Sequence, residues 1–151
     1  MKFCFWGDIA DAILGKTIGG GEIQIAQLAK ALARKGHEVV IIDFEAEESF
    51  TTEEGVQVKS VPGWSKGIPG LKILIHQLPL LYRLLKAEKA DYYYVRMRSY
   101  LNLTSYLAAR KNKAKFIVAL AHDLDVAGFS ARFKYEYKSR FSLKSFFTLY
   151  L

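Results

Sequence analysis

The chain has 151 residues, of which 51% are hydrophobic and 25% charged, and it carries a formal net charge of +7. This length predicts one domain with its own core, and the composition excludes a disordered or fibrous protein. The positive charge favours anionic partners such as nucleotides or acidic lipid surfaces; zinc-finger, helix-turn-helix and RNA-binding signatures are missing, so no nucleic-acid partner is expected.

The first predicted element is a short buried strand over Phe3–Trp6, which contains the single cysteine of the chain. One cysteine excludes an internal disulfide and fits a reducing compartment. Only four apolar residues follow Met1-Lys2, too few for a signal peptide, so a cytoplasmic location is expected. A long loop, Gly7 to Gly21, comes next. Its Asp8 and Asp11 are either ligands for an acceptor hydroxyl or solvated loop acids.

Three consecutive glycines, Gly19, Gly20 and Gly21, lead directly into a regular amphipathic helix that ends at Gly36. Apolar residues recur there at helical spacing, namely Ile25, Leu28, Ala29 and Leu32. The first N–H groups of a helix lack intrahelical partners, and glycine lets an anion approach closely. The loop is therefore a candidate phosphate or diphosphate site, or else a tight turn that packs helix on sheet. The apolar run Val39–Ile42 then predicts a strand buried on both faces.

Two known phosphate-loop signatures fail to match this region. The dinucleotide fingerprint G-x-G-x-x-G is missing, although Asp43 ends the second predicted strand, where a ribose-binding acid would lie. Residues Ala10 to Thr17 resemble a Walker loop, but its Lys16-Thr17 leads into more loop instead of a helix. An NAD-type nucleotide-binding domain remains an alternative that lacks a matching motif.

The second half of the chain alternates helices and strands after an acidic turn region, Glu45 to Glu54. Strands are predicted over Val56–Val61, Asp91–Met97 and Phe116–Ala121. Helices are predicted over Leu71–Leu85, kinked near Pro79, and over Tyr100–Lys111, capped by Ser99 with Leu103, Tyr106 and Leu107 on one face. This alternation predicts an α/β fold: a Rossmann-like, mostly parallel sheet with helices on both faces. The Leu71–Leu85 helix is too short to span a bilayer and is either part of the core or a membrane-facing amphipathic helix. Its His76 is expected on the helix surface or partly buried, not as a ligand.

Polar residues follow the last two predicted strands. Arg96 and Arg98 stand at the carboxyl end of one strand, the edge where open parallel sheets bind ligands, and can hold a phosphate or carboxylate. His122 and Asp123 directly follow the other. An imidazole there can share a proton with a substrate hydroxyl, or simply bond to nearby backbone. Residues with metal-ligand spacing are missing, so no metal is expected.

The last segment, Arg132 to Leu151, interleaves basic and aromatic residues. This pattern is typical of an interfacial helix, and also of a surface helix whose aromatic side packs on the domain. The sequence ends at Leu151 within apolar residues, which predicts a continuation.

The glycine loop and its helix resemble the N-terminal domain of the family 4 glycosyltransferases, which have the two-domain GT-B fold. The G-G-x-E start corresponds to Gly19–Glu22, the A-x-x-L-A-type body runs through Ala33, and the G-H-E-V exit is Gly36–Val39. The strand that exits into His122 is also similar, since the family commonly places a histidine there against the transferred sugar. The resemblance implies the N-terminal half of a retaining enzyme that transfers a hexose from a nucleoside-diphosphate sugar to an acceptor, without cofactor or metal.

By this resemblance, residues 1–151 are the acceptor-side domain, and the donor-binding domain with its paired-glutamate motif is absent. The roles implied are donor phosphate binding by Gly19, Gly20 and Gly21, sugar positioning by His122, contact with substrate by Asp123, and neutralisation of an anionic acceptor by Arg96 or Arg98. The acceptor would be a sugar or a lipid-linked molecule. The positive net charge and the basic and aromatic segment Arg132 to Leu151, rather than the resemblance, suggest a protein peripheral to the inner face of an anionic membrane. The isolated chain would be inactive. The alternatives are a non-catalytic fragment, a subunit that needs a partner chain, or the NAD-type domain.

Overall fold

The computed structural model describes residues 1–16, 19–67, 71–96 and 101–119. The first half contains β1 (Lys2–Gly7), α1 (Ala10–Ile13), α2 (Gly20–Arg34), β2 (Glu38–Asp43), β3 (Phe50–Thr51) and β4 (Val56–Ser60). The second half contains the π-helix η1 (Ile73–Gln77), α3 (Leu78–Glu88), β5 (Tyr92–Val95), α4 (Asn102–Lys111) and β6 (Lys115–Val118).

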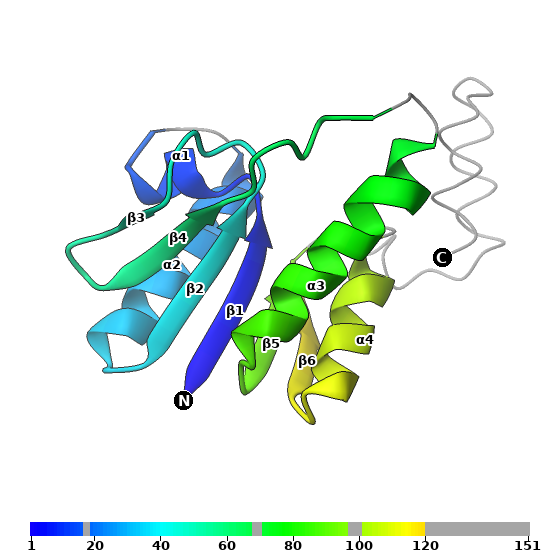
Figure 1. Cartoon of the computed structure of the whole chain (residues 1–151). Coiled ribbons are helices and arrows are strands. Elements are labelled where there is room, and N and C mark those ends of the chain that lie inside the picture. The colour runs from blue at the N-terminus through cyan, green and yellow to red at the C-terminus, as the bar shows by residue number, and fades with distance from the viewer. Residues whose placement is uncertain (17–18, 68–70, 97–100, 120–151) are drawn as a thin grey trace, which may run out of the picture.

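The strands form one sheet in the order β3-β4-β2-β1-β5-β6 (Figure 1). All neighbouring strands are parallel except the short pair of β3 and β4, which is antiparallel. β1 lies inside the sheet between β2 and β5, and the chain builds outward from it in both directions. This arrangement confirms the predicted α/β fold with a mostly parallel, Rossmann-like sheet.

Helices cover both faces of the sheet, because successive residues of each buried strand point to opposite sides. Phe5 packs with Val39, Ile41 and the inner face of α2 in one core. Cys4 and Trp6 belong to the other core, which is covered by α3 and α4. The connection that follows β1 therefore runs to one face and the connection that follows β5 to the other. In an open parallel sheet, the crevice between two such strands is where ligands bind.

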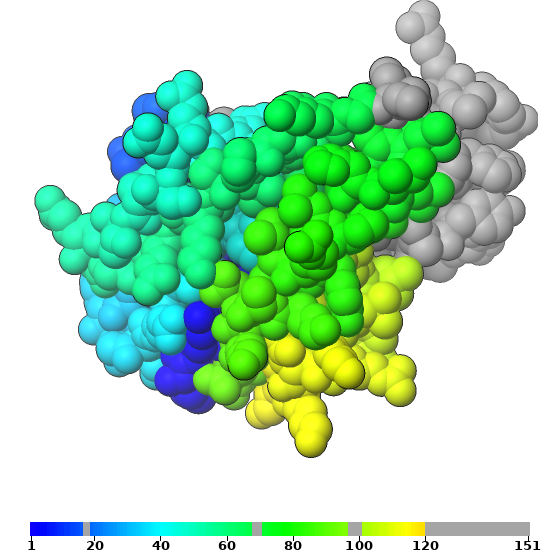
Figure 2. Space-filling view, viewed as in Figure 1, coloured from blue at the N-terminus to red at the C-terminus, as the bar shows by residue number. Residues whose placement is uncertain are grey.

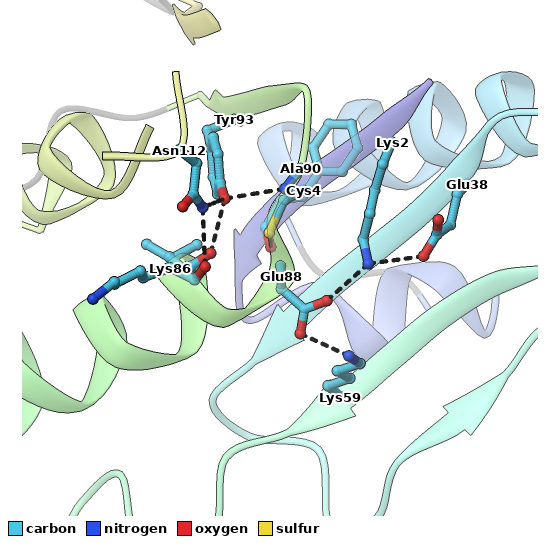
Figure 3. Close-up of polar contacts among 11 residues, drawn as sticks. Lys2, Cys4, Glu38, Lys59, Lys86, Glu88, Ala90, Tyr93 and Asn112 are labelled. Atoms are coloured by element: carbon cyan, nitrogen blue, oxygen red, sulfur yellow. Dashed lines mark hydrogen bonds and ion pairs between the residues drawn. The ribbon is translucent and has the colours of Figure 1, made fainter. Parts of the chain in front are cut away.

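The carboxyl end of α3 is tied to the sheet by polar side chains (Figure 3). The hydroxyl of Tyr93 donates to the carbonyl of Leu85 at 2.8 Å and accepts from the Ala90 N–H at 3.2 Å and the Asn112 side-chain amide at 2.6 Å. The nearby carboxylate of Glu88 pairs with Lys59 and Lys2. These contacts fix the end of α3 against β5 and α4.

The last two elements are less buried than their apolar residues suggest. Leu103, Tyr106 and Leu107, which were predicted to share one face of α4, are all exposed, and the buried face consists of Thr104, Ser105, Ala108 and Ala109. These small residues let α4 approach closely, and Ser105 Oγ accepts a 2.6 Å hydrogen bond from the Trp6 indole. The strand predicted over Phe116–Ala121 ends at Val118, and its Ile117 and Val118 are exposed because β6 is the last strand of the described sheet. The predicted cap Ser99 lies outside the described residues.

The expected kink near Pro79 takes the form of a change in helix type. η1 ends at Gln77, α3 begins at Leu78, and Pro79 stands in the first turn of α3, where its missing N–H falls at the junction. His76 is half-buried and hydrogen-bonded to the carbonyl of Gly63. Within the described part of the chain, no helix has the length and apolar character needed to cross a bilayer.

Candidate functional site

A cavity of about 770 Å³ opens at the edge where β1 and β2 end, and its wall is strongly acidic. The carboxyl groups that line it belong to Asp8, Asp11, Glu22, Asp43, Glu45, Glu47 and Glu48. Lys16, also in the wall, is paired with Asp11 at 2.8 Å, so one acid is neutralised. The remaining carboxylates make this side of the sheet edge negatively charged.

Asp43 holds the rim of this cavity in place. It is fully buried, and its Oδ2 accepts hydrogen bonds from the N–H groups of Ile9 and Ala10, both at 2.6 Å. Its Oδ1 accepts from the N–H groups of Glu45 and Ala46 at 2.9 and 2.7 Å. One side chain thus caps the start of α1 and closes the turn after β2. Both oxygens are committed to the backbone, so Asp43 offers no lone pair to a ribose.

Asp8 is the cavity residue with the most perturbed titration. Burial, together with the nearby negative charges of Glu45, Asp43 and Glu22, raises its pKa to about 6. Between about pH 4 and pH 6 the folded protein therefore holds a proton that the unfolded chain releases. Asp8 consequently makes folding less favourable as the pH rises through that window.

We expect Asp8→Asn to stabilise the protein at pH 7–8, because it removes a carboxylate that is held near others of like charge. The gain should be about 1 kcal/mol or less, since Asp8 is partly exposed and solvent screens its charge. It should vanish below about pH 3, where the carboxyl is protonated in both states. Urea denaturation across this pH range measures it. Asp11→Asn is the matched control, with an expected change below about 0.5 kcal/mol; equal stabilities of Asp8→Asn and wild type at every pH would contradict the prediction.

The glycine loop forms the start of α2, with Gly19 as the N-cap. The first helical hydrogen bond runs from the Ile23 N–H to the Gly19 carbonyl at 3.2 Å, so the N–H groups of Gly20, Gly21 and Glu22 precede the intrahelical pattern. A β-carbon built on Gly20 meets no atom within 4 Å, so the backbone is open there. These are the features that let an anion approach a helix N-terminus.

Arg96 lies against this loop. It directly follows β5, is half-buried, and its Nε is 3.7 Å from the point that a β-carbon on Gly21 would occupy. That Nε is buried and has no hydrogen-bond partner in the described part of the chain. The structure thus brings Arg96 and the glycine loop together, because Arg96 follows β5, the loop comes in the connection after β1, and these two strands are neighbours in the sheet.

Glu22 and Arg96 place opposite charges at the two ends of the glycine loop. Its carboxylate folds back over Gly19, so that a β-carbon on Gly19 would collide with it. Negative charge therefore covers the Gly19 end, which faces the acidic cavity, whereas the positive guanidinium of Arg96 covers the Gly21 end. An anion is favoured on the side of Gly20 and Gly21, and a neutral polar or cationic group is favoured in the cavity.

The other predicted site residues, Arg98, His122 and Asp123, lie outside the described residues. Three acids that line the cavity after β2 were not predicted as site residues, namely Glu45, Glu47 and Glu48. Their position directly after a buried parallel strand was the available signal. Among the residues that the structure describes, no group of three or more His, Cys, Asp or Glu is arranged to hold a metal ion.

Comparison with known proteins gives one match. A model of the domain described as Glycosyltransferase Family 4 matches residues 18–150, which is most of the chain and includes the glycine loop, Arg96 and the described strands β2 to β6, while β1 precedes the matched range. Searches among curated proteins and among solved structures give no match. Membership implies glycosyl transfer in general, with a sugar donor and an acceptor as substrates. The chain belongs to the family 4 glycosyltransferases and has the Rossmann-like N-terminal domain of their GT-B fold.

Proposed function

We propose that this chain is the acceptor-side domain of a retaining glycosyltransferase that takes a hexose from a nucleoside-diphosphate sugar. The observation that carries the proposal is the position of Arg96 beside Gly21, at the open start of α2. A guanidinium and free helix N–H groups at one point favour a diphosphate over a neutral ligand. A donor-binding domain, from a longer chain or from a partner, would complete the cleft.

In the proposed reaction, the acceptor oxygen bonds to the anomeric carbon of the donor while the bond from that carbon to the diphosphate breaks, and the proton of the acceptor hydroxyl passes to an oxygen of the leaving diphosphate. Negative charge then develops on the leaving diphosphate. The N–H groups of Gly20 and Gly21 and the side chain of Arg96 stabilise this charge. The carboxylates of the cavity, Asp8 among them, accept hydrogen bonds from acceptor hydroxyl groups. His122 is assigned, by family resemblance, to positioning the sugar.

The NAD-type alternative finds no support in this geometry. The residue that would bind the ribose in such a domain is Asp43, and four backbone N–H groups already occupy its carboxylate. The alternative of a non-catalytic fragment, or of a subunit that needs a partner chain, differs from the proposal only in whether this chain is active without a donor-binding domain. It is tested by adding a family 4 donor-binding domain to the purified chain and measuring transfer from several nucleotide sugars.

The phosphate site is tested by titrating the ¹⁵N-labelled chain with a nucleoside diphosphate and following its backbone amide signals. We expect the largest shifts at Gly20, Gly21 and Glu22, and about a tenfold or greater loss of affinity in Arg96→Ala, since the variant lacks a charge-assisted hydrogen bond. Arg110→Ala, at the exposed end of α4, is the matched control and should bind like wild type. Shifts centred on another part of the sheet, or tighter binding of NAD than of any sugar nucleotide, would overturn the proposal.

A further inference from the structure

We propose that the acidic cavity binds a polyhydroxylated ligand that carries an ammonium group, such as an amino sugar. The cavity, of about 770 Å³, falls within the size range of small-molecule sites and lies between α1 and the loop after β2. Figure 2 shows these two segments, in blue and turquoise, side by side at the upper left of the molecule. The role of this ligand as the acceptor rests on the proposed function, whereas its binding to the cavity does not.

The wall of the cavity has the opposite charge to the chain as a whole. The chain carries a net charge of +7, yet seven of its 15 acidic residues line this cavity. Two of the seven are already occupied, since Asp11 pairs with Lys16 and Asp43 is bonded to backbone N–H groups. Within the described part of the chain, the other five form no ion pair, namely Asp8, Glu22, Glu45, Glu47 and Glu48. A cation therefore supplies the counter-charge that this wall lacks.

The positions of these acids fit an extended organic cation better than a metal ion. They come from three separate stretches, which are the connection after β1, the start of α2 and the loop after β2. Among the residues that the structure places, no three His, Cys, Asp or Glu are grouped to hold a metal ion. A metal ion needs several ligand atoms about 2.0–2.6 Å from one point. An ammonium group needs one or two carboxylates, which leaves the others to accept hydrogen bonds from hydroxyl groups.

Apolar side chains complete the wall of the cavity. Leu14, which is 58% exposed, and half-buried Phe50 line it together with the acids. A pyranose ring presents C–H groups on its faces and polar groups around its rim. Its faces can therefore pack on Leu14 and Phe50 while its amine and hydroxyl groups reach the carboxylates. An inorganic cation would leave these apolar side chains without a contact.

The cavity and the proposed phosphate site are neighbours of opposite charge. The carboxylate of Glu22 covers Gly19, which belongs to the cavity wall, and the guanidinium of Arg96 lies beside Gly21. An ammonium group in the cavity would thus lie close to an anion bound at the start of α2, and the two ligands would attract each other. An anionic ligand in the cavity would be repelled both by the wall and by that anion. The geometry therefore favours an amine-bearing acceptor over the anionic acceptor that the family resemblance implied.

The binding is tested by calorimetric titration of the 151-residue chain with two disaccharides of the same size. The first is the β-1,4-linked disaccharide of glucosamine, a diamine that is protonated at about pH 6.5, below the usual pKa of an α-amino group. The second is cellobiose, which has hydroxyl groups in place of both amines and is neutral. We expect the diamine to bind about tenfold more tightly or better, since it alone forms charge-assisted hydrogen bonds. Added salt should weaken its binding.

Two double variants with the same change in charge locate the binding. Glu45→Gln combined with Glu48→Gln removes two carboxylates from the cavity wall and should weaken binding of the diamine about tenfold or more, with little effect on cellobiose. The matched control is Glu38→Gln combined with Glu53→Gln, at the start of β2 and in the turn before β4, which is the opposite end of the sheet. It should bind the diamine like wild type. All four side chains are exposed, and circular dichroism checks that the variants fold.

Asp8 gives a second readout that reports from inside the cavity. Burial and the charges of Glu45, Asp43 and Glu22 raise its pKa to about 6. A bound ammonium group favours the ionised carboxylate, so saturation with the diamine should lower the pKa of Asp8, whereas cellobiose should leave it unchanged. The carboxyl ¹³C signal of Asp8, followed through a pH titration, measures this difference.

Several results would overturn the proposal: equal affinity for the diamine and cellobiose, no binding by wild type, or an equal loss in the control at Glu38 and Glu53. Displacement of the diamine by Mg²⁺, but not by Na⁺ at equal ionic strength, would also overturn it, because a metal ion would then be the occupant. No nucleotide is present in these titrations. Their failure would therefore leave the phosphate site at Gly20 and Gly21 untouched, and failure of the phosphate site would leave the binding of the amine untouched.

Discussion

Replacing Asp43 by alanine should destabilise the protein by about 3–5 kcal/mol, the largest effect that we expect from any polar substitution. The carboxylate is fully buried and accepts hydrogen bonds from Ile9, Ala10, Glu45 and Ala46. Alanine leaves these four N–H groups without their acceptor, and each unsatisfied buried group costs roughly 1–3 kcal/mol, less where water can enter. Urea denaturation followed by circular dichroism measures the loss.

Two further variants separate hydrogen bonding from loss of charge. Asp43→Asn keeps one acceptor oxygen and presents an amide to the other pair of N–H groups, so an intermediate loss is expected. Asp11→Ala removes an exposed acid from the same cavity and should change stability by less than about 0.5 kcal/mol. If Asp43→Ala were no less stable than Asp11→Ala, Asp43 would not be the residue that holds the rim.

The interior of the fold could be predicted because its signals are local. The helix that begins after Gly19 shows both a periodic apolar stripe and glycines at its ends, and β2 shows a continuous apolar run. Short elements give no such signal. α1 has four residues and depends on Asp43, which is 33 positions away from Ala10, and β3 has two residues that pair with β4. Both were predicted as loop, because tertiary contacts rather than local pattern determine them.

The buried face of α4 could not be predicted, for the same reason. An apolar row at Leu103 and Leu107 suggests a buried face, yet the face that contacts the core contains Ser105 and Ala108. The decisive contact is the hydrogen bond from the Trp6 indole to Ser105, across 99 positions of sequence. The association of Arg96 with Gly21 is likewise a product of topology. Sequence placed both at the ligand edge of the sheet, but only the strand order brings the ends of β1 and β5 together.

Tyr93→Phe should destabilise the protein by about 2–3 kcal/mol, although it deletes a single oxygen atom. The ring is buried, so its packing is retained, and the change isolates the hydroxyl. That hydroxyl serves the Leu85 carbonyl, the Ala90 N–H and the Asn112 amide at once (Figure 3). Asn112 is partly exposed and also bonded to Lys86, so water can replace its lost contact. The Leu85 and Ala90 groups have less access to water, and their unmet hydrogen bonds account for most of the expected loss.

Tyr92→Phe is the matched control, because Tyr92 stands on the same strand and stacks on Phe3, while its hydroxyl makes no hydrogen bond to another described residue. Its expected change in unfolding free energy is below about 0.5 kcal/mol. Amide hydrogen exchange shows where the structure is weakened. Loss of the Tyr93 hydroxyl should speed exchange at the Ala90 amide and in the last turn of α3. Exchange should change less in α2, which packs on the other face of the sheet. Equal acceleration in α2 would mean that the hydroxyl supports the whole fold instead of the junction between α3, β5 and α4.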